Sequence, residues 1–229
     1  KKLESEVFKN ADVTLATSYT DAENFRKKGA NAFCITNGFD VDASTTLSMT
    51  EENSKTLPLS NSTTKFTLSY IGVLEQLRNP EILWETLNNL VSQNENFTID
   101  FELKFVGRLD DKILQKIESS ALKNNLTNLG YQTHDVALKH MQDSTVLLMT
   151  NFPQESSKGI IPGKIFEYLA TGKTILSFGP KDADVEKILN ETKAGKHFGY
   201  DEKENLKKFI LESYQNWKSG TLNQNAENI

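Results

Sequence analysis

The sequence has one cysteine, Cys34, and only three of its 26 basic residues are arginine. A single cysteine excludes an intrachain disulfide framework and fits a reducing compartment, so we expect a cytoplasmic protein. No stretch reaches the roughly 18 apolar residues that a membrane-spanning helix needs. The net charge of −5 provides no basic field, so nucleic acid is not an expected partner.

Motifs that would define a common ligand are also absent. The GKT at 172–174 suggests a phosphate-binding loop, but Glu167 stands where that motif needs its first glycine. No G-x-G-x-x-G follows an apolar strand, so a dinucleotide is not expected. The three histidines have no metal-ligand spacing with Cys34, and Asp182 and Asp184 are better explained as caps of a helix than as a metal-binding pair.

What the sequence does contain is a regular alternation of apolar strands and amphipathic helices from residue 65 onward. The predicted strands lie at 65–72, 101–107, 126–131, 145–150 and 174–179. The predicted helices lie at 80–93, 110–125, 133–142, 162–171, 182–191 and 201–218. Strands that are apolar on both faces are typical of a parallel sheet covered on both sides. The sequence therefore predicts an α/β fold, a Rossmann-like doubly wound parallel sheet with helices on both faces.

The alternation also predicts how the chain is divided. Residues 1–36 contain two helices and two short strands, and residues 37–64 are rich in Ser, Thr and Asn without an apolar period, as expected of a hinge and linker loop. Residues 65–218 form the main domain, and 219–229 are a tail. Because the N-terminus resembles the middle of a helix, we expect the chain to begin inside a larger protein.

The helix predicted at 162–171 carries an unusual first turn. Lys164 lies there, where a positive charge is unfavourable unless an anion binds between the lysine and the positive end of the helix dipole. Free N–H groups at a helix start bind anions, and Gly159 and Gly163 allow a ligand to approach. Glu167 lies on the same face one turn later, where it can accept hydrogen bonds from hydroxyl groups, and helical spacing places Tyr168 on this polar face as well.

Two arginines favour an anion site at the same edge of the predicted sheet. Arg78 follows the strand at 65–72, and Arg108 follows the strand at 101–107. In open α/β sheets, ligands bind outside the carboxyl ends of the strands. A solvated polar face and surface arginines remain the alternative explanation of these residues when each is taken alone.

The segment KGIIPGKIFEYLATGKTILSFGPKDADVEKIL resembles the donor-binding domain of retaining glycosyltransferases of the two-domain B fold, family four. The sequence NGFD at 37–40 resembles the hinge of that family, and SYIGVLEQLRNPEIL resembles its first donor-domain loop. The resemblance covers residues 7 to about 215 and implies the donor half of a glycosyltransferase B fold. Residues 1–36 would then be a remnant of the N-terminal acceptor domain, and 65–218 the nucleotide-sugar-binding domain.

The resemblance implies roles for individual residues. The family has two glutamates spaced E-x7-E, of which Glu167, the second, would bind the ribose, whereas Gly159 replaces the first. The positions implied for the diphosphate are Lys164, Arg78, Gly72 and Gly163. Those implied for the base are Tyr131 and Gln132, and those implied for the sugar pocket are Gly159 and Glu186. No catalytic residue is assigned.

The activity implied is that of a hexosyltransferase, which transfers a sugar from a nucleotide-diphosphate sugar to an acceptor in glycan or polysaccharide synthesis. Members of the family need no metal or other cofactor. A glycan or lipid-linked acceptor would bind through the N-terminal domain, where a peripheral membrane contact is also expected, and the present chain alone would not transfer sugar. Two alternatives stay open, namely a sugar-nucleotide epimerase of the same fold and a non-catalytic nucleotide-sugar-binding module.

Overall fold

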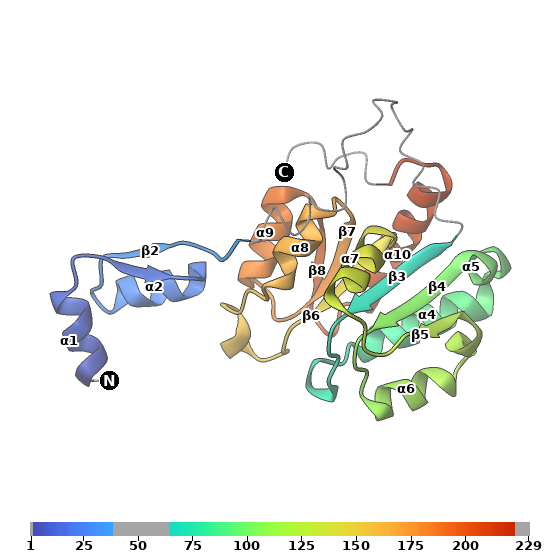
Figure 1. Ribbon diagram of the computed structural model, residues 1–229, viewed down its shortest axis with the longest axis horizontal. Helices are drawn as coiled ribbons and strands as arrows, with labels where there is room; N and C mark the ends of the chain where they lie inside the picture. Colours follow the sequence, from blue (N-terminus) through green and yellow to red (C-terminus); the bar gives the residue numbers. More distant parts are fainter. Residues whose placement is uncertain (1, 39–64, 223–229) are drawn as a thin grey trace.

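The computed structural model describes residues 2–38 and 65–222, which form a small N-terminal lobe and a larger α/β domain (Figure 1). Most of the predicted hinge and linker at 37–64, and most of the predicted tail at 219–229, lie outside the described residues.

The α/β domain is built on a six-stranded parallel sheet in the order β5-β4-β3-β6-β7-β8. The strands are β3 (Phe66–Ile71), β4 (Phe101–Val106), β5 (Leu126–Asn128), β6 (Val146–Thr150), β7 (Thr174–Phe178) and β8 (Gly195–Phe198). From β3 the chain adds strands in one direction and from β6 in the other, so the order reverses between these two strands. This confirms the predicted doubly wound parallel sheet.

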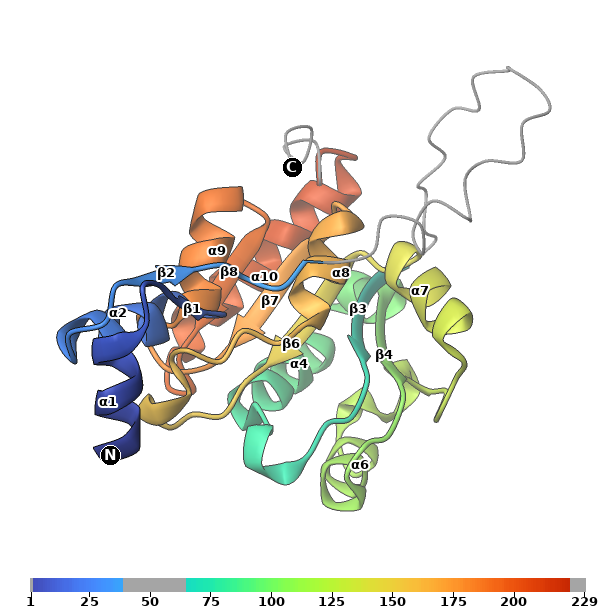
Figure 2. The same ribbon diagram turned by 60° about the vertical axis from the view of Figure 1, so that its left-hand side comes forward.

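Helices cover both faces of this sheet (Figure 2). One face packs against α4 (Glu81–Gln93), α5 (Glu95–Asp100), α6 (Asp111–Glu118) and α10 (Lys203–Lys218). The other packs against α7 (His134–Gln142), α8 (Lys164–Ala170) and α9 (Asp184–Thr192). Three short 3-10 helices are η1 (Gln76–Arg78), η2 (Ala121–Asn125) and η3 (Glu155–Ser157). Alternate residues of each strand point into one of two separate apolar cores, as the pleat requires.

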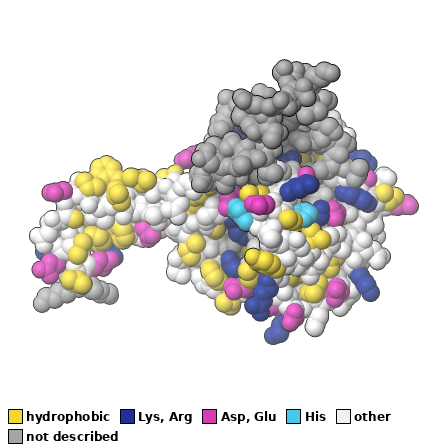
Figure 3. All heavy atoms as spheres, in the orientation of Figure 1, with side chains coloured by type: hydrophobic (Ala, Val, Ile, Leu, Met, Phe, Trp, Pro, Cys, Tyr) yellow, Lys and Arg dark blue, Asp and Glu magenta, His cyan; other side chains and the backbone are white. Residues whose placement is uncertain are grey.

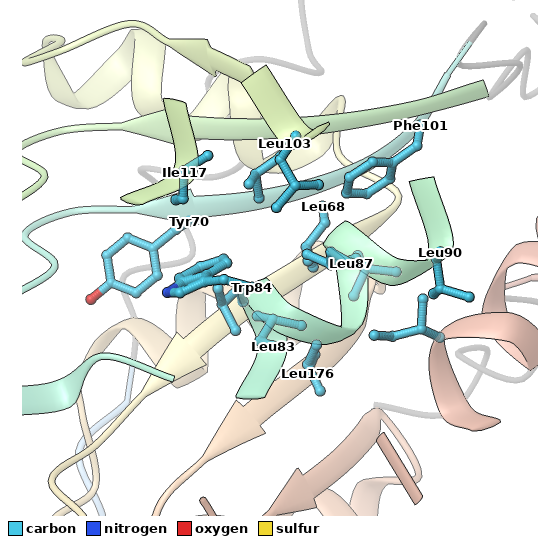
Figure 4. Close-up of a cluster of buried hydrophobic side chains, with 14 of the residues drawn as sticks. Leu68, Tyr70, Leu83, Trp84, Leu87, Leu90, Phe101, Leu103, Ile117 and Leu176 are labelled. Carbon is cyan, nitrogen blue, oxygen red and sulfur yellow. The ribbon is translucent and has the colours of Figure 1, made fainter. Parts of the chain in front are cut away.

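The larger core lies between α4 and the strands β3 and β4 (Figure 4). Within it, the Trp84 ring packs against Phe105 with the ring centroids 5.8 Å apart, and the indole N–H donates to Asn79 Oδ1 at 2.6 Å. Pro80 holds the N-cap position of α4, and Asn79, just before it, is buried beside Trp84. A buried indole N–H needs an acceptor, and Asn79 provides it.

Several predicted boundaries differ from the structure. The helix predicted at 110–125 ends at Glu118, because the hydroxyls of Ser119 and Ser120 bond to backbone carbonyls of the last turn. The strand predicted at 126–131 ends at Asn128, followed by a left-handed residue at Gly130. The short elements α5 and β8 were not predicted. Their apolar runs are too brief to show a period.

The N-terminal lobe consists of α1 (Lys2–Asn10), β1 (Thr14–Ala16), α2 (Tyr19–Lys27) and β2 (Ala32–Cys34), with β1 and β2 paired in parallel. It has a small core of its own, built from Phe8, Phe25, Ala30 and Ala32. Hydrophobic side chains also gather on its surface (Figure 3), where Val13, Leu15, Phe33 and Ile35 are exposed. That the lobe is a remnant of a larger acceptor domain stays a prediction.

One buried carboxylate fastens the lobe to the α/β domain. Asp184, in the first turn of α9, is fully buried and accepts hydrogen bonds from the backbone N–H and the hydroxyl of Thr20 at 2.9 and 2.8 Å. Thr20 lies in the first turn of α2, so one carboxylate faces the amino ends of two helices, where negative charge is stabilised. The Lys187 ammonium lies 3.2 Å away. Asp184 was expected to cap its own helix, but it satisfies an N–H of α2 instead.

Glycines end three neighbouring strands at the carboxyl edge of the sheet. Gly72, Gly107 and Gly130 have φ of 114°, 125° and 63°. The Gly72 N–H donates to Val106 O and the Gly107 N–H to Gly130 O, each at 2.7 Å, so the hydrogen-bonded ladder continues beyond the strands. A methyl group at Gly107 would lie 2.2 Å from the Gly72 carbonyl oxygen. The close approach of the two turns therefore requires glycine at 107.

We expect Gly107→Ala to lower the free energy of unfolding by at least about 3 kcal/mol, through backbone strain and overlap with Gly72. Gly130→Ala is the matched control, because no other part of the described chain lies within 4 Å of the added methyl group. The control should lose only about 1–2 kcal/mol, the cost of a left-handed alanine. Urea denaturation of both variants measures this. Equal losses of unfolding free energy in the two variants would show that overlap with Gly72 does not contribute.

Candidate functional site

The strand order reverses between β3 and β6, and in sheets of this type such a reversal marks a crevice at the carboxyl edge. The connection after β3 leads toward one face, and the connection after β6 leads toward the other. In folds of this type, ligands bind at that point. The distance of each predicted site residue from this crevice therefore decides whether it could contact a ligand there.

Lys164 reaches across this crevice. It is the first residue of α8, after β6, and Gly163 precedes it as the N-cap residue without a side-chain cap. Its ammonium donates to Ile71 O at 3.0 Å and lies 3.4 Å from Tyr70 Oη, both at the end of β3. A methyl group added to Gly72 would lie 3.4 Å from the same Nζ atom. The structure thus brings Lys164, Gly163 and Gly72 together.

Two expectations for α8 need correction. Lys164 was expected to be unfavourable without an anion, but its ammonium has the Ile71 carbonyl and also lies 4.4 Å from the centroid of the Tyr70 ring. Tyr168 was expected on the polar face, but it is fully buried. The hydroxyl of Tyr168 accepts from Ile71 N at 3.3 Å and donates to Leu148 O at 3.4 Å, which joins α8 to both central strands. Burial raises the pKa of Tyr168 far above its ordinary value.

Arg78 lies at the end of η1, in the connection after β3. Its Nη2 donates to Val73 O at 3.1 Å and lies 3.4 Å from a carboxylate oxygen of Glu75. The guanidinium carbon lies 5.4 Å from the centroid of the Phe152 ring, which belongs to the connection after β6. The Nε–H is buried without a partner among the described residues. A buried donor without a partner is costly, so this N–H remains available to an acceptor.

The connections after β3 and β6 are joined by Tyr200, which follows β8. The Tyr200 hydroxyl donates to Asn151 O at 2.5 Å and lies 3.4 Å from Arg78 O. Burial is the main cause that raises the pKa of Tyr200. Nearby, burial also lowers the pKa of His197, whose Nε2 lies 3.0 Å from Pro180 O and whose Nδ1 lies 3.0 Å from Ser177 Oγ. Tyr200 therefore ties the connections after β3 and β6 together.

The two glutamates of the predicted site differ in their surroundings. Glu167, half-buried on α8, has no hydrogen-bond or ion-pair partner among the residues that the structure describes. Glu186 accepts from the N–H of Asp182 at 2.7 Å and so stabilises a left-handed residue with φ of 58°. Lys158 lies between Glu155, at 2.8 Å, and Asp182, at 4.0 Å, and its hydrogen bond to Glu155 raises its pKa. Glu167 is the carboxylate left open to a ligand.

The residues predicted to line a base are at the far side of the same edge. Tyr131 is 87% exposed, and Gln132 donates from Nε2 to Leu129 O at 2.8 Å. Both follow β5, which β4 separates from β3. The structure places them on the predicted edge but shows no contact between them and Lys164 or Arg78.

Gly159 lies against the N-terminal lobe. A methyl group there would lie 3.0 Å from Ser18 Oγ and 3.1 Å from Thr20 Cβ. Both distances are shorter than ordinary van der Waals contact. The lobe therefore packs closely against the position where the resembling family has its first glutamate, and a side chain there would push against Ser18 and Thr20.

Within residues 2–38 and 65–222, no three histidine, cysteine, aspartate or glutamate side chains converge as metal ligands would. None of the helices in this part of the chain is both long and apolar enough to cross a membrane.

Comparison with models of known protein families gives no match, and neither does comparison with curated protein sequences. Solved structures do match. HepE of Anabaena, in a complex with UDP, has a TM-score of 0.70 and 18% identity, covering 96% of this chain and 59% of that one. TarM of S. aureus, in a complex that includes UDP, has a TM-score of 0.68 and 16% identity, covering 100% and 42%. WaaG, a glycosyltransferase involved in lipopolysaccharide biosynthesis, has a TM-score of 0.62 and 15% identity, covering 93% and 56%.

These likenesses show that the chain has the fold of the B-type glycosyltransferases. It spans 59% of the length of HepE and 42% of the length of TarM. At identities below 20% the likeness concerns the fold alone, so the roles of individual residues depend on the geometry of the crevice.

Substituting Gly159→Glu, which introduces the glutamate of the resembling family, should displace Ser18 and Thr20. Overpacking of this kind costs about 1–3 kcal/mol, and we expect it to appear as weaker hydrogen-exchange protection of the Thr20 amide, which donates to Asp184. Gly163→Glu is the matched control, because Gly163 is exposed and the described residues leave space around it. NMR-detected exchange measures both variants. Unchanged protection in Gly159→Glu would contradict the tight contact with the lobe.

Proposed function

We propose that this chain contains the donor-binding part of a glycosyltransferase of the hexosyltransferase type. The enzyme transfers a sugar from a nucleotide-diphosphate sugar to an acceptor in glycan or polysaccharide synthesis. The observation that carries the proposal is the position of the Lys164 ammonium beside Gly72, at the point where the strand order reverses. Proteins of the same fold support it, since HepE has been solved with UDP and with UDP-glucose. The 158–189 segment supports membership of family four.

The crevice offers two cations to a diphosphate. Lys164 begins α8, and Arg78 ends η1 on the opposite side. An ionised phosphate oxygen attracts the Lys164 ammonium more strongly than the neutral Ile71 carbonyl oxygen does, so a phosphate competes well for it. Gly72 and Gly163 leave space for the phosphates. Glu167, one turn along α8, would accept hydrogen bonds from the ribose hydroxyls.

The proposed chemistry depends on charge already in place. When the sugar leaves, negative charge builds up on the diphosphate, and fixed cations stabilise it without reorganisation. Lys164 and Arg78 would supply that charge, so the proposal needs no metal or other cofactor. Tyr131 and Gln132 would lie beside the base, and Glu186 beside the sugar.

The acceptor belongs to the rest of the proposed enzyme. The chain spans little more than half of HepE, so a glycan or lipid-linked acceptor would bind mainly to a domain outside this sequence. We place the reaction in the cytoplasm, with a peripheral contact to the membrane surface when the acceptor is a lipid. The packing of the lobe against Gly159 favours a second candidate, a nucleotide-sugar-binding module without transfer activity. Transfer by the longer protein from UDP-sugars would decide between them.

Calorimetric titration with UDP and with uridine tests the proposal on the chain as it stands. Lys164→Gln should weaken UDP binding by about 1.5–3 kcal/mol, the range for a hydrogen bond to a charged group, and leave uridine binding unchanged. Lys123→Gln, at an exposed lysine that precedes β5 at the opposite edge, should change neither affinity. A wild-type protein that binds UDP no better than uridine would refute the proposed diphosphate site.

Glu167→Gln should give a different pattern, because the ribose is common to both ligands. We expect UDP and uridine binding to weaken together, by about 1.5–3 kcal/mol. Stability should change little, since the Glu167 carboxylate has no partner among the described residues. Glu118→Gln, at an exposed residue on α6, serves as the control. If Glu167→Gln changes the affinity for UDP but not for uridine, Glu167 lies beside the phosphates and does not bind the ribose.

A further inference from the structure

Tyr70 is a buried core residue whose polar end faces the crevice. It is the second-last residue of β3 and is 1% exposed. Its ring packs 6.4 Å from the ring of Phe105, centroid to centroid. Figure 4 shows the ring at one end of the core cluster, with the hydroxyl turned away from the labelled apolar side chains. Packing on the ring fixes the position of the hydroxyl group.

The Tyr70 hydroxyl stands between the two cations of the site. It donates to Val73 O at 2.9 Å, and Arg78 Nη2 donates to the same carbonyl oxygen at 3.1 Å. On its other side, Lys164 Nζ lies 3.4 Å from the hydroxyl oxygen and 4.4 Å from the ring centroid. Because a tyrosine hydroxyl has one proton and two lone pairs, it can donate to Val73 and still accept from Lys164. Tyr70 therefore contacts Lys164 directly and is linked to Arg78 through the Val73 carbonyl.

We infer that Tyr70 is a positioning residue, which holds Lys164 and Arg78 at a fixed spacing so that one diphosphate contacts both. The inference rests on the proposed function and adds a residue that sequence reasoning missed. Lysine and arginine have many rotamers, and immobilising each of them on binding costs side-chain entropy. Because the empty protein already restrains both side chains, less of the binding free energy is lost to immobilising them when the diphosphate binds. The face of the tyrosine ring also attracts the ammonium group directly.

The matched pair Tyr70→Phe and Tyr168→Phe separates positioning from packing. Each removes one hydroxyl at the end of β3, but the Tyr168 hydroxyl bonds to Ile71 N and Leu148 O and contacts neither cation in the described structure. We expect Tyr70→Phe to weaken UDP binding about fivefold or more, as the loss of a hydrogen bond to a charged group predicts, without changing uridine binding. Tyr168→Phe should leave the ratio of UDP to uridine affinity at the wild-type value, whatever it does to stability.

The outcomes distinguish this inference from the proposed function. If the wild-type protein binds UDP and uridine equally well, the diphosphate site itself is refuted. If the wild type prefers UDP and Tyr70→Phe retains the full preference, the site stands and the role of Tyr70 is overturned. Equal loss of the preference in both variants also overturns it, because packing at the end of β3 would then be the cause.

A second measurement needs no change at Tyr70 and keeps the inference testable if Tyr70→Phe fails to fold. Lys164→Gln in the empty protein should shift the NMR resonance of the Arg78 Nε–H group, because Tyr70 and the Val73 carbonyl link the two side chains. Lys158→Gln serves as the control, since Lys158 pairs with Glu155 instead. An unchanged Arg78 resonance in Lys164→Gln would show that the side chains are independent and would overturn the inference.

Discussion

The geometry of the site depends on one topological constraint, the reversal of strand order between β3 and β6. Parallel strands need crossover connections that cover the sheet, so the chain must leave the carboxyl ends of these two strands toward opposite faces. The crevice follows from this before any side chain is considered. Arg78 enters it from the β3 side and Lys164 from the β6 side. The location of the proposed anion site is therefore set by how the sheet is wound.

The side chains that stabilise the domain also shape the crevice. Tyr70 and Tyr168 are both buried, one in each apolar core, and the hydroxyls of both reach the end of β3. Burial fixes the rings, and each fixed ring presents a hydroxyl at a defined place. Close packing on the two faces of the sheet therefore restrains the side chains at the end of β3. A change in the core near Tyr70 would alter the position of the hydroxyl that contacts Lys164.

Apolar periodicity allowed the parallel sheet and its two helical layers to be predicted, because it is a local feature. The grouping of Lys164, Gly72 and Gly163 was implied by the resemblance to the glycosyltransferase family. The sequence could not reveal the roles of Tyr168 or Asp184. A helical wheel places Tyr168 among polar residues, yet its ring is long enough to reach β3, 97 residues earlier in the chain. Asp184 looked like a cap for its own helix, but its partner Thr20 is 164 positions away. Partners at such separations are set by packing, which a single sequence does not display.

The attachment of the lobe has a mechanical consequence. Asp184 bonds to Thr20 through its side chain, while its backbone N–H donates to Lys158 O at 2.9 Å, next to Gly159. The lobe, the start of α9 and the segment leading to Lys164 are thus connected through one residue. A displacement of the lobe would therefore be transmitted through Asp184 to the segment that leads to Lys164.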